Sequence, residues 1–167
     1  MIKKIAIIGL PGSGKSTLAK NLSKRFNLSV YHLDAHMFEE GSKGIKKDKK
    51  EIARIEQAMV NQESWIIEGC SLSTLETRFQ KADVVIYLKP SRITCLLRLL
   101  KRAIFSKKGL KDTGCFFGIN FRILKYLWFF ESEKGPQIYV LSQKYPNTQF
   151  LIISSEKQLK VHHDHLS

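Results

Sequence analysis

Short apolar runs alternate with longer stretches of helical spacing along this chain. The apolar runs are rich in Ile, Val and Leu, and they predict strands at residues 2–8, 28–33, 65–68, 84–88 and 149–153. In the intervening segments apolar residues recur every three or four positions, which predicts helices over 15–26, 48–62, 91–104, 119–130 and 135–145. Unbroken apolar strands are buried on both faces, so the alternation predicts an α/β fold: a parallel sheet with helices on both sides.

The segment between the first predicted strand and the first predicted helix spells G-x-x-x-x-G-K-S. This is the phosphate-binding loop (P-loop) motif, in the strand–loop–helix context that it requires. Its glycines let successive backbone N–H groups face one anion, and the following helix adds its N-terminal donors and dipole. We therefore expect a nucleoside triphosphate to be bound by Gly9, Pro11, Gly12, Ser13, Gly14, Lys15, Ser16 and Thr17.

Acidic residues at two strand ends are candidates for the chemistry. Lys15 is expected to reach the β- and γ-phosphates and the Ser16 hydroxyl to ligate Mg²⁺. Ligands of open parallel sheets collect beyond the carboxyl ends of the strands, where Asp34 and Glu68 follow apolar runs. We expect Asp34 to orient or deprotonate an acceptor hydroxyl, and Glu68 or Asp34 to hold the metal through water. The alternative for each acid is a helix N-cap or a solvated strand end.

Basic and histidine side chains supply further candidates. Arg98 and Arg102 are four residues apart in a predicted helix, so they share one face and could clamp a transferring phosphoryl group. His36, close to Asp34, is a candidate acceptor contact, whereas strand alternation predicts that His32 points away from Asp34.

Positive charge is unevenly distributed. The chain has 28 Lys and Arg against 15 Asp and Glu, a net charge of +13, which favours polyanionic partners such as nucleotides or nucleic acid. Over half of the surplus falls between residues 92 and 125, where Asp112 is the one acidic residue. The glycines and lysines near 105–122 predict a lid-like basic insert that closes over phosphates, with a solvated basic face as the alternative. The aromatic residues from 116 to 130 fit core packing, or stacking on a base.

Length and composition predict one domain over residues 1–167. The apolar run nearest to membrane-spanning length is interrupted by Arg122 and Lys125, and the first strand begins too early to leave room for a signal peptide. Three isolated cysteines predict free thiols in a reducing compartment. We expect a cytoplasmic protein, monomeric or homodimeric, with no membrane partner.

Several of these stretches resemble P-loop kinases of the adenylate-kinase-like group and, more narrowly, the bacterial DNA topology modulation protein (FlaR-like) family. The resemblance rests on residues 7–18, 30–35, 65–69, 83–102 and 126–128. It implies a three-layer P-loop NTPase fold with strand order 2-3-1-4-5 and a small helical lid. It also implies that the arginines at 98 and 102 contact nucleotide phosphates and base.

The chain departs from that group at three places. The third strand ends in Glu68-Gly69 where Asp-Gly is usual, and Lys89 stands where the fourth strand commonly closes with aspartate. Residues 70–73 replace the D-G-[FY]-P-R continuation that binds a monophosphate acceptor, and Arg78 is the nearest arginine for that task.

Together these features predict a kinase that transfers the γ-phosphoryl group of MgATP to a small, phosphorylated or nucleotide-like acceptor. The alternative is a nucleotide-dependent module that binds nucleic acid or protein and has weak ATPase activity. The net charge, the aromatic–basic stretch and the missing acceptor motif favour that alternative. A GTPase switch is disfavoured, since neither a convincing N-K-x-D motif nor D-x-x-G after the third strand is present.

Overall fold

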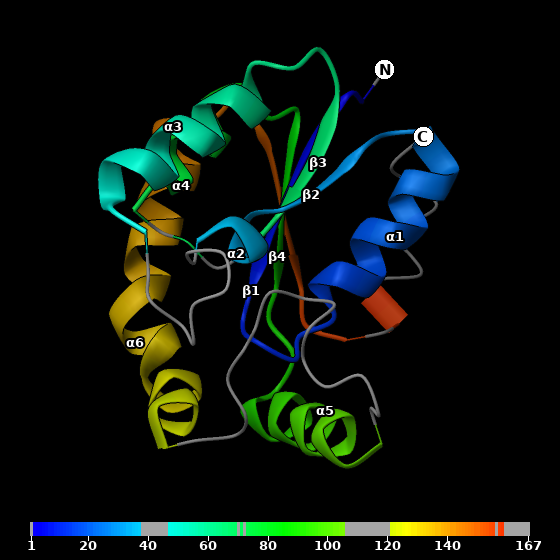
Figure 1. The fold of residues 1–167 in the computed structure, drawn as a ribbon, viewed down its shortest axis with the longest axis vertical. Coiled ribbons are helices and arrows are strands. Elements are labelled where there is room, and N and C mark those ends of the chain that lie inside the picture. Colours follow the sequence, from blue (N-terminus) through cyan, green and yellow to red (C-terminus); the bar gives the residue numbers. More distant parts are fainter. Residues whose placement is uncertain are drawn as a thin grey trace.

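The computed structural model describes residues 2–37, 47–69, 71, 73–105, 121–155 and 157–158. Its centre is a five-stranded parallel sheet with the strand order β2-β3-β1-β4-β5 (Figure 1). In chain order the strands are β1 (Lys4–Gly9), β2 (Val30–His32), β3 (Trp65–Glu68), β4 (Val84–Leu88) and β5 (Gln149–Ile153). The predicted fold class and strand order are confirmed.

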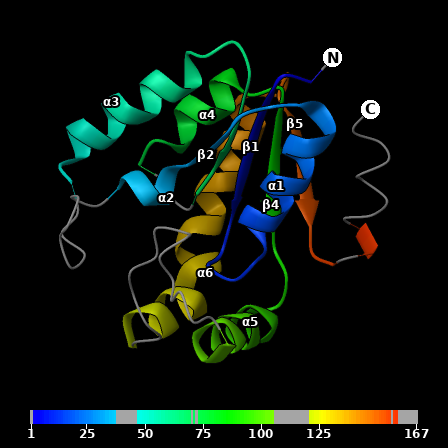
Figure 2. The same cartoon turned by 45° about the vertical axis from the view of Figure 1, so that its right-hand side comes forward.

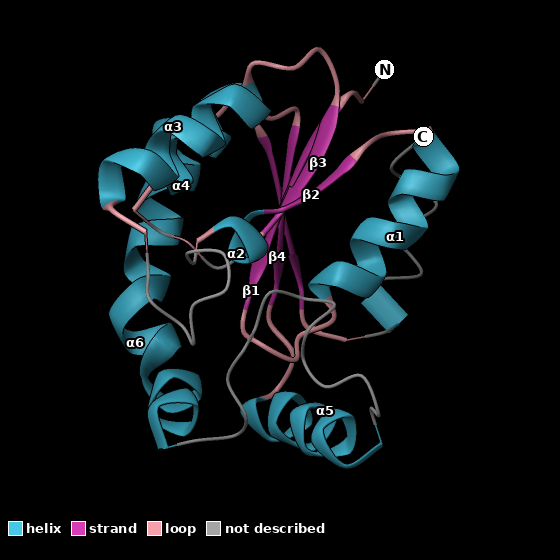
Figure 3. Ribbon diagram, in the orientation of Figure 1, coloured by secondary structure: helices cyan, strands magenta, loops and turns pink. Residues whose placement is uncertain are grey.

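Helices cover both faces of this sheet (Figure 3). On one side lie α3 (Lys49–Val60), α4 (Leu75–Lys81) and α6 (Phe121–Lys144), and on the other lies α1 (Lys15–Phe26). The short helix α2 (Leu33–His36) follows β2 directly. Figure 2 shows α5 (Arg92–Phe105) beyond the ends of β1 and β4, at the edge of the sheet where the P-loop lies.

The sheet separates two apolar clusters. Ile5 and Ile7 of β1 face α1, where they pack with Leu22 and its neighbours. Ala6 and Ile8 point the other way, into the cluster beneath α3, α4 and α6. All four side chains are at most 1% exposed, as expected for a central parallel strand covered on both faces.

The predicted strands 65–68, 84–88 and 149–153 and the predicted helix 15–26 have the observed bounds. Strand β1 begins at Lys4 and ends at Gly9, so it starts later than the predicted strand 2–8 and runs one residue further. Strand β2 is shorter than the predicted strand 28–33 at both ends. It ends at His32 because residues 33–36 form α2. Helix α3 begins at Lys49, where the Asp48 carboxylate accepts a hydrogen bond from the Lys50 N–H at 3.3 Å. The helices α2 and α4 were not predicted, because fewer than about two turns show no clear period.

One prediction of two helices is wrong. Within the described residues, the segments predicted as separate helices at 119–130 and 135–145 form the single helix α6 (Phe121–Lys144), which runs through Pro136. Leu127, Phe130, Ile138 and Leu141 keep one helical face and all pack in the same core cluster. The apolar period therefore outweighs the proline, which removes one backbone donor but does not end the helix.

The predicted basic insert at 105–122 lies almost wholly outside the described residues, as do Cys70, Cys115 and residues 159–167. Cys95 is a buried free thiol, in line with the predicted cysteine state at that position. In the part of the chain that the structure describes, no helix is both long and apolar enough to span a membrane.

Candidate functional site

The P-loop connects β1 to α1 and is pressed against two other elements. A Cβ on Gly9 would lie 2.4 Å from the Leu88 carbonyl oxygen of β4, and one on Gly12 would lie 2.5 Å from the Cys95 carbonyl oxygen of α5. Gly12 also has a backbone φ of 78°, which residues other than glycine rarely adopt. Gly9 and Gly12 are therefore required by close backbone approach as well as by conformation.

The N-terminus of α1 opens onto the inside of this loop. Its N-cap residue, Gly14, makes no side-chain capping bond, and the first turn contains no acidic residue. The N–H groups of the first turn and the positive end of the helix dipole form a site for an anion. The Ser13 hydroxyl is buried in the loop without a hydrogen-bond partner among the described residues.

Lys15 curls back over the loop. Its ammonium group donates to the carbonyl oxygens of Gly9 at 3.1 Å and Leu10 at 3.0 Å, and the side chain is buried. This places a fixed positive charge inside the concave side of the P-loop. A phosphate chain seated on the loop would meet that charge together with the α1 amides.

A hollow of about 210 Å³ lies at this loop, and we call it the P-loop hollow. Its lining combines residues from four parts of the chain that the sequence analysis treated separately. They are Pro11, Gly12, Gly14, Lys15, Ser16, Thr17, Asp34, Glu68, Arg98, Leu99 and Arg102. Six loop residues, both acids and both arginines predicted for the site therefore meet in one place.

Glu68 lies at the end of β3 and is 3% exposed. Its Oε1 accepts a hydrogen bond from the Ser16 hydroxyl at 2.9 Å and lies 2.6 Å from Nδ1 of His32. Burial opposes ionisation, but the hydrogen bond from His32, the charge of Lys15 and the hydrogen bond from Ser16 outweigh it and lower the Glu68 pKa. The buried carboxylate is thus held ionised beside the Ser16 hydroxyl.

His32 is a site residue that the sequence analysis missed. The hydrogen bond with Glu68 raises its pKa, against the lowering effect of partial burial. His32 ends β2 and is paired in register with Glu68 of β3. Parallel register depends on tertiary structure, so the sequence carried no signal for this contact.

Asp34 enters the P-loop hollow from the first turn of α2 rather than from the end of a strand. Its carboxylate rests against the backbone of Gly69, because a Cβ there would lie 3.0 Å from Asp34 Oδ1. His36, at the last position of α2, is exposed and is not among the residues lining the hollow. The structure therefore brings Asp34 to the phosphate site and leaves His36 outside it.

Arg98 and Arg102 lie on the face of α5 that looks toward the P-loop. Arg98 Nη1 donates to the Ser13 carbonyl oxygen at 3.2 Å, which fixes its guanidinium group above the loop. With Lys15 they make three cations around one hollow, against the two acids. This excess of positive charge suits a multiply charged anion.

A second hollow of about 670 Å³ continues from the first, and we call it the side hollow. The two share Gly14, Thr17 and Arg98. The remaining lining mixes apolar and hydroxyl side chains with one amide: Ser13, Leu18, Asn21, Leu88, Pro90, Thr94, Ile153, Ser154 and Ser155. Together the hollows offer a charged compartment and a larger, less charged one along the same loop.

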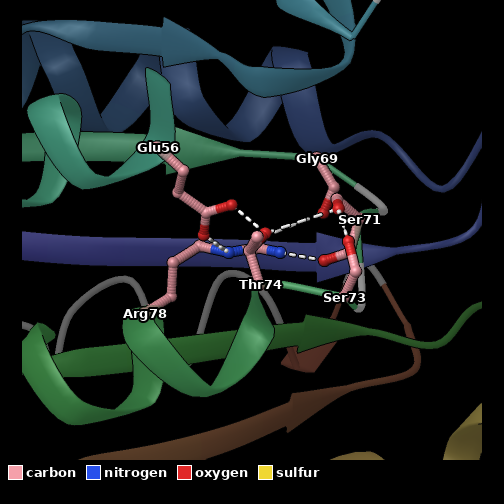
Figure 4. A network of polar contacts seen from close by, with 6 residues as sticks. All are labelled: Glu56, Gly69, Ser71, Ser73, Thr74 and Arg78. Carbon is pink, nitrogen blue, oxygen red and sulfur yellow. Dashed lines mark hydrogen bonds and ion pairs between the residues drawn. The ribbon is translucent and has the colours of Figure 1, made fainter. Parts of the chain in front are cut away.

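Arg78 does not line either hollow. Its side chain is fully buried between α3 and α4, with Nε 2.9 Å from Glu56 Oε1 (Figure 4). Burial raises the pKa of Glu56, although the charge of Arg78 and hydrogen bonds from Thr74 and Arg78 lower it. Lys89 also turns away from the P-loop and pairs with Glu131 of α6.

The residues around Ser16 fit a magnesium ion that is also held by phosphate oxygens. Mg²⁺ prefers oxygen ligands, keeps several waters and commonly takes only one or two protein carboxylates. The Ser16 hydroxyl and the Glu68 and Asp34 carboxylates provide this donor set at one hollow. In the described part of the chain, no cluster of three or more His, Cys, Asp or Glu forms a separate metal site.

Comparison with known proteins agrees with this architecture. Residues 5–112 match the model of the family described as AAA_18, AAA domain. A shikimate kinase from Mycobacterium ulcerans (strain Agy99) is 34% identical over 65 residues, which make up 36% of this chain and 35% of that protein. The chain thus matches about a third of the length of this relative.

Solved structures show the same fold. A shikimate kinase from Bacteroides thetaiotaomicron has a TM-score of 0.65 at 15% identity, covering 99% of this chain and 97% of that one. The Acinetobacter baumannii shikimate kinase in complex with shikimate gives 0.59 at 12% identity, with coverages of 99% and 95%. Deoxyadenosine kinase from M. mycoides with bound dATP gives 0.53 at 16% identity, with both coverages 98%.

Proposed function

The chain belongs to the AAA_18 family, and on this premise we propose that it is an ATP-dependent kinase that phosphorylates a small acceptor. The observation that carries the proposal is the P-loop hollow. It brings the P-loop lysine and serine together with two carboxylates and two arginines from α2, β3 and α5. Phosphoryl transfer depends on positioning and electrostatic stabilisation, and this is the set of groups that it needs.

Each group has a proposed role. The α1 amides and Lys15 bind the β- and γ-phosphates, and the side hollow takes the nucleoside. Ser16 and Glu68 hold Mg²⁺, Glu68 through a water, and the ion would neutralise charge on the phosphates. Arg98 and Arg102 stabilise the charge of the transferring group.

The acceptor is assigned to the side of the hollow that Asp34 borders. Its carboxylate can accept the proton of an acceptor hydroxyl or orient that hydroxyl. His36 and Arg78 were expected to assist, but both lie outside the hollow, so Asp34 carries the proposed acceptor contact. The matched proteins are named as kinases of shikimate and deoxyadenosine, which supports a small molecule as acceptor.

The deciding experiment is ATP consumption with Mg²⁺ against a panel of acceptors: nucleoside monophosphates, nucleosides, shikimate, sugars and short nucleic acids. A kinase gives one acceptor class that raises turnover well above the rate with water. The Lys15→Ala variant serves as the inactive control, and Lys20→Ala, on the exposed side of α1, as the matched active one. Flat, slow hydrolysis across the panel, with tight ATP binding, would contradict the proposal.

The alternative, a nucleotide-dependent binding module, is favoured by one surface feature. Trp128 of α6 is 61% exposed, and the Arg92 guanidinium lies 5.4 Å from the centre of its ring. An exposed aromatic ring beside a cation suits stacking on a base. This reading agrees with the narrower resemblance to the topology modulation proteins, which is likewise a proposal. Preference for one nucleic-acid structure, changed by ATP and lost in Trp128→Ala, would support it.

A further inference from the structure

A buried polar cluster lies beside the end of β3 and is not used by the proposed mechanism. Arg78 of α4 and Glu56 of α3 form an ion pair whose side chains are 0% and 1% exposed, and the Thr74 hydroxyl donates to the second Glu56 oxygen (Figure 4). Taking two charges out of water is costly, and such pairs can often be replaced by apolar residues without loss of stability. Stability alone therefore explains this arrangement poorly.

The remaining donors of Arg78 hold the chain just after β3. Nη1 donates to the Gly69 carbonyl oxygen at 3.2 Å, and Nη2 donates to the Ser71 carbonyl oxygen. On its other side, the Gly69 N–H donates to the Ile7 carbonyl oxygen of β1 at 3.2 Å. Gly69 is thus fixed between the central strand and a buried guanidinium group.

Gly69 adjoins both acids of the P-loop hollow. It follows Glu68 directly in the sequence. Its Cα faces Asp34, since a Cβ there would lie 3.0 Å from Asp34 Oδ1 and 3.0 Å from Leu33 Cβ. A shift of the Gly69 backbone would therefore displace Glu68 by covalent connection and Asp34 by contact.

We infer that Arg78, anchored by Glu56, is a positioning residue that sets the places of Asp34 and Glu68 through Gly69. The planar guanidinium group has donors in fixed directions, so it can grip two carbonyl oxygens and a carboxylate at once. Arg78 contacts neither hollow, so it acts only through the backbone that it holds. The inference rests on the proposed function, in which these two acids serve the acceptor and the metal.

A double variant separates positioning from stability. Glu56→Leu/Arg78→Met replaces the pair by apolar side chains of similar volume, which preserves packing. We expect it to fold and to bind ATP within about threefold of wild type. Its kcat for phosphoryl transfer should fall about 30-fold or more, since displacements near 1 Å cost on the order of 100-fold. The matched control is Glu76→Gln/Lys144→Met, which removes an exposed ion pair between α4, the helix of Arg78, and α6, and should leave kcat unchanged.

A folded Glu56→Leu/Arg78→Met protein with wild-type kcat would overturn the inference, because a merely structural pair changes stability and not the rate per folded molecule. Arg78→Lys provides the second test. A lysine ammonium group lacks the planar array of donors with which Arg78 meets the Gly69 and Ser71 carbonyl oxygens and the Glu56 carboxylate together, so kcat should again fall while ATP affinity is kept. If the double variant does not fold, a wild-type rate in Arg78→Lys decides against the inference.

The proposed function can fail separately. If the wild-type protein transfers phosphate to no acceptor, the kinase proposal is wrong. Hydrogen exchange of the Gly69 amide then measures whether Arg78 fixes this part of the backbone. The Gly69 amide should then exchange about tenfold faster or more in the double variant, with β4 amides unchanged. Equal exchange in both proteins would show that Arg78 does not fix this backbone.

Discussion

Individual side chains of the P-loop hollow are held in place by contacts with other helices and strands. Glu68 receives hydrogen bonds from Ser16 of α1 and from His32 of β2, and Arg98 reaches the Ser13 carbonyl oxygen from α5. Groups held by several neighbours keep their directions, which is what electrostatic catalysis requires. Substitutions of single side chains therefore test the proposed chemistry most directly.

Asp34→Asn should separate transfer from binding. The amide is nearly isosteric with the carboxylate but cannot take a proton from an acceptor hydroxyl, so kcat should fall about 100-fold or more. ATP affinity should change little, because Lys15 and the α1 amides hold the phosphates. Steady-state kinetics and a nucleotide titration measure the two quantities. Equal losses in both would assign Asp34 a binding role instead.

The His32–Glu68 contact predicts a pH dependence of stability. The His32 pKa is raised above 6.5, so the stabilisation that protonated His32 provides is complete below pH 6.5 and is lost as pH rises through the raised value. The lowered Glu68 pKa gives stability that is present above pH 4.5 and is lost on acidification through its folded-state value. Both contributions to the free energy of unfolding are therefore fully present together between pH 4.5 and pH 6.5.

Denaturant unfolding of wild type and His32→Asn at several pH values measures this effect. The difference between the two proteins should be larger near pH 6 than near pH 9. It should stay within about 1 kcal/mol, because His32 is partly exposed to solvent. A difference that does not vary with pH would show that His32 contributes packing only.

At the scale of elements, the strands and the first helix could be predicted because their buried residues form continuous or periodic apolar patterns in the sequence. The gap predicted at residues 131–134 was wrong, since the packing period of α6 continues through it. The P-loop residues could be identified because backbone geometry demands glycine at fixed spacing. The contacts of His32 and the burial of Arg78 could not, because strand register and the packing of α3 on α4 determine them.

Two glycines in different elements should respond oppositely to alanine. In Gly12→Ala the new Cβ would meet the Cys95 carbonyl oxygen at 2.5 Å, at φ of 78°, so α5 must move away from the loop. We expect about 1–3 kcal/mol of destabilisation and weaker ATP binding. Gly135→Ala lies in α6, where the new Cβ would lie 3.1 Å from Oε1 of Glu131, a side chain paired with Lys89. A small shift of that carboxylate makes room, so the change should be neutral or stabilise by up to about 1 kcal/mol.

Thermal unfolding of both variants checks the comparison. A Gly12→Ala protein as stable as wild type would show that the P-loop and α5 are not packed as described. A strongly destabilised Gly135→Ala protein would show that α6 cannot accommodate a side chain at that position.

At the scale of the molecule, the three-layer fold places every proposed site residue at the carboxyl edge of the sheet. The P-loop hollow joins α1, α2, β3 and α5 across that edge. A ligand that contacts all of them therefore stabilises the folded chain against unfolding, by about 2.7 kcal/mol at one hundred times its Kd.

For a protein of this size, MgATP at that concentration should raise the Tm by roughly 5–10 °C. Differential scanning fluorimetry with and without MgATP measures the shift. We expect Lys15→Ala, which removes hydrogen bonds to the Gly9 and Leu10 carbonyl oxygens, to fold and to lose most of the shift. A full shift in that variant would remove the P-loop as the binding site.

The position of Cys95 in α5 has one more consequence. Cys95 is fully buried in the core cluster, and burial raises the pKa of its thiol, so the sulfur can react only when α5 moves away from that core. In a protein whose other two cysteines are replaced by serine, the rate of thiol alkylation would count these openings. Alkylation of Cys95 would thus report how often the helix that carries Arg98 and Arg102 opens from the core.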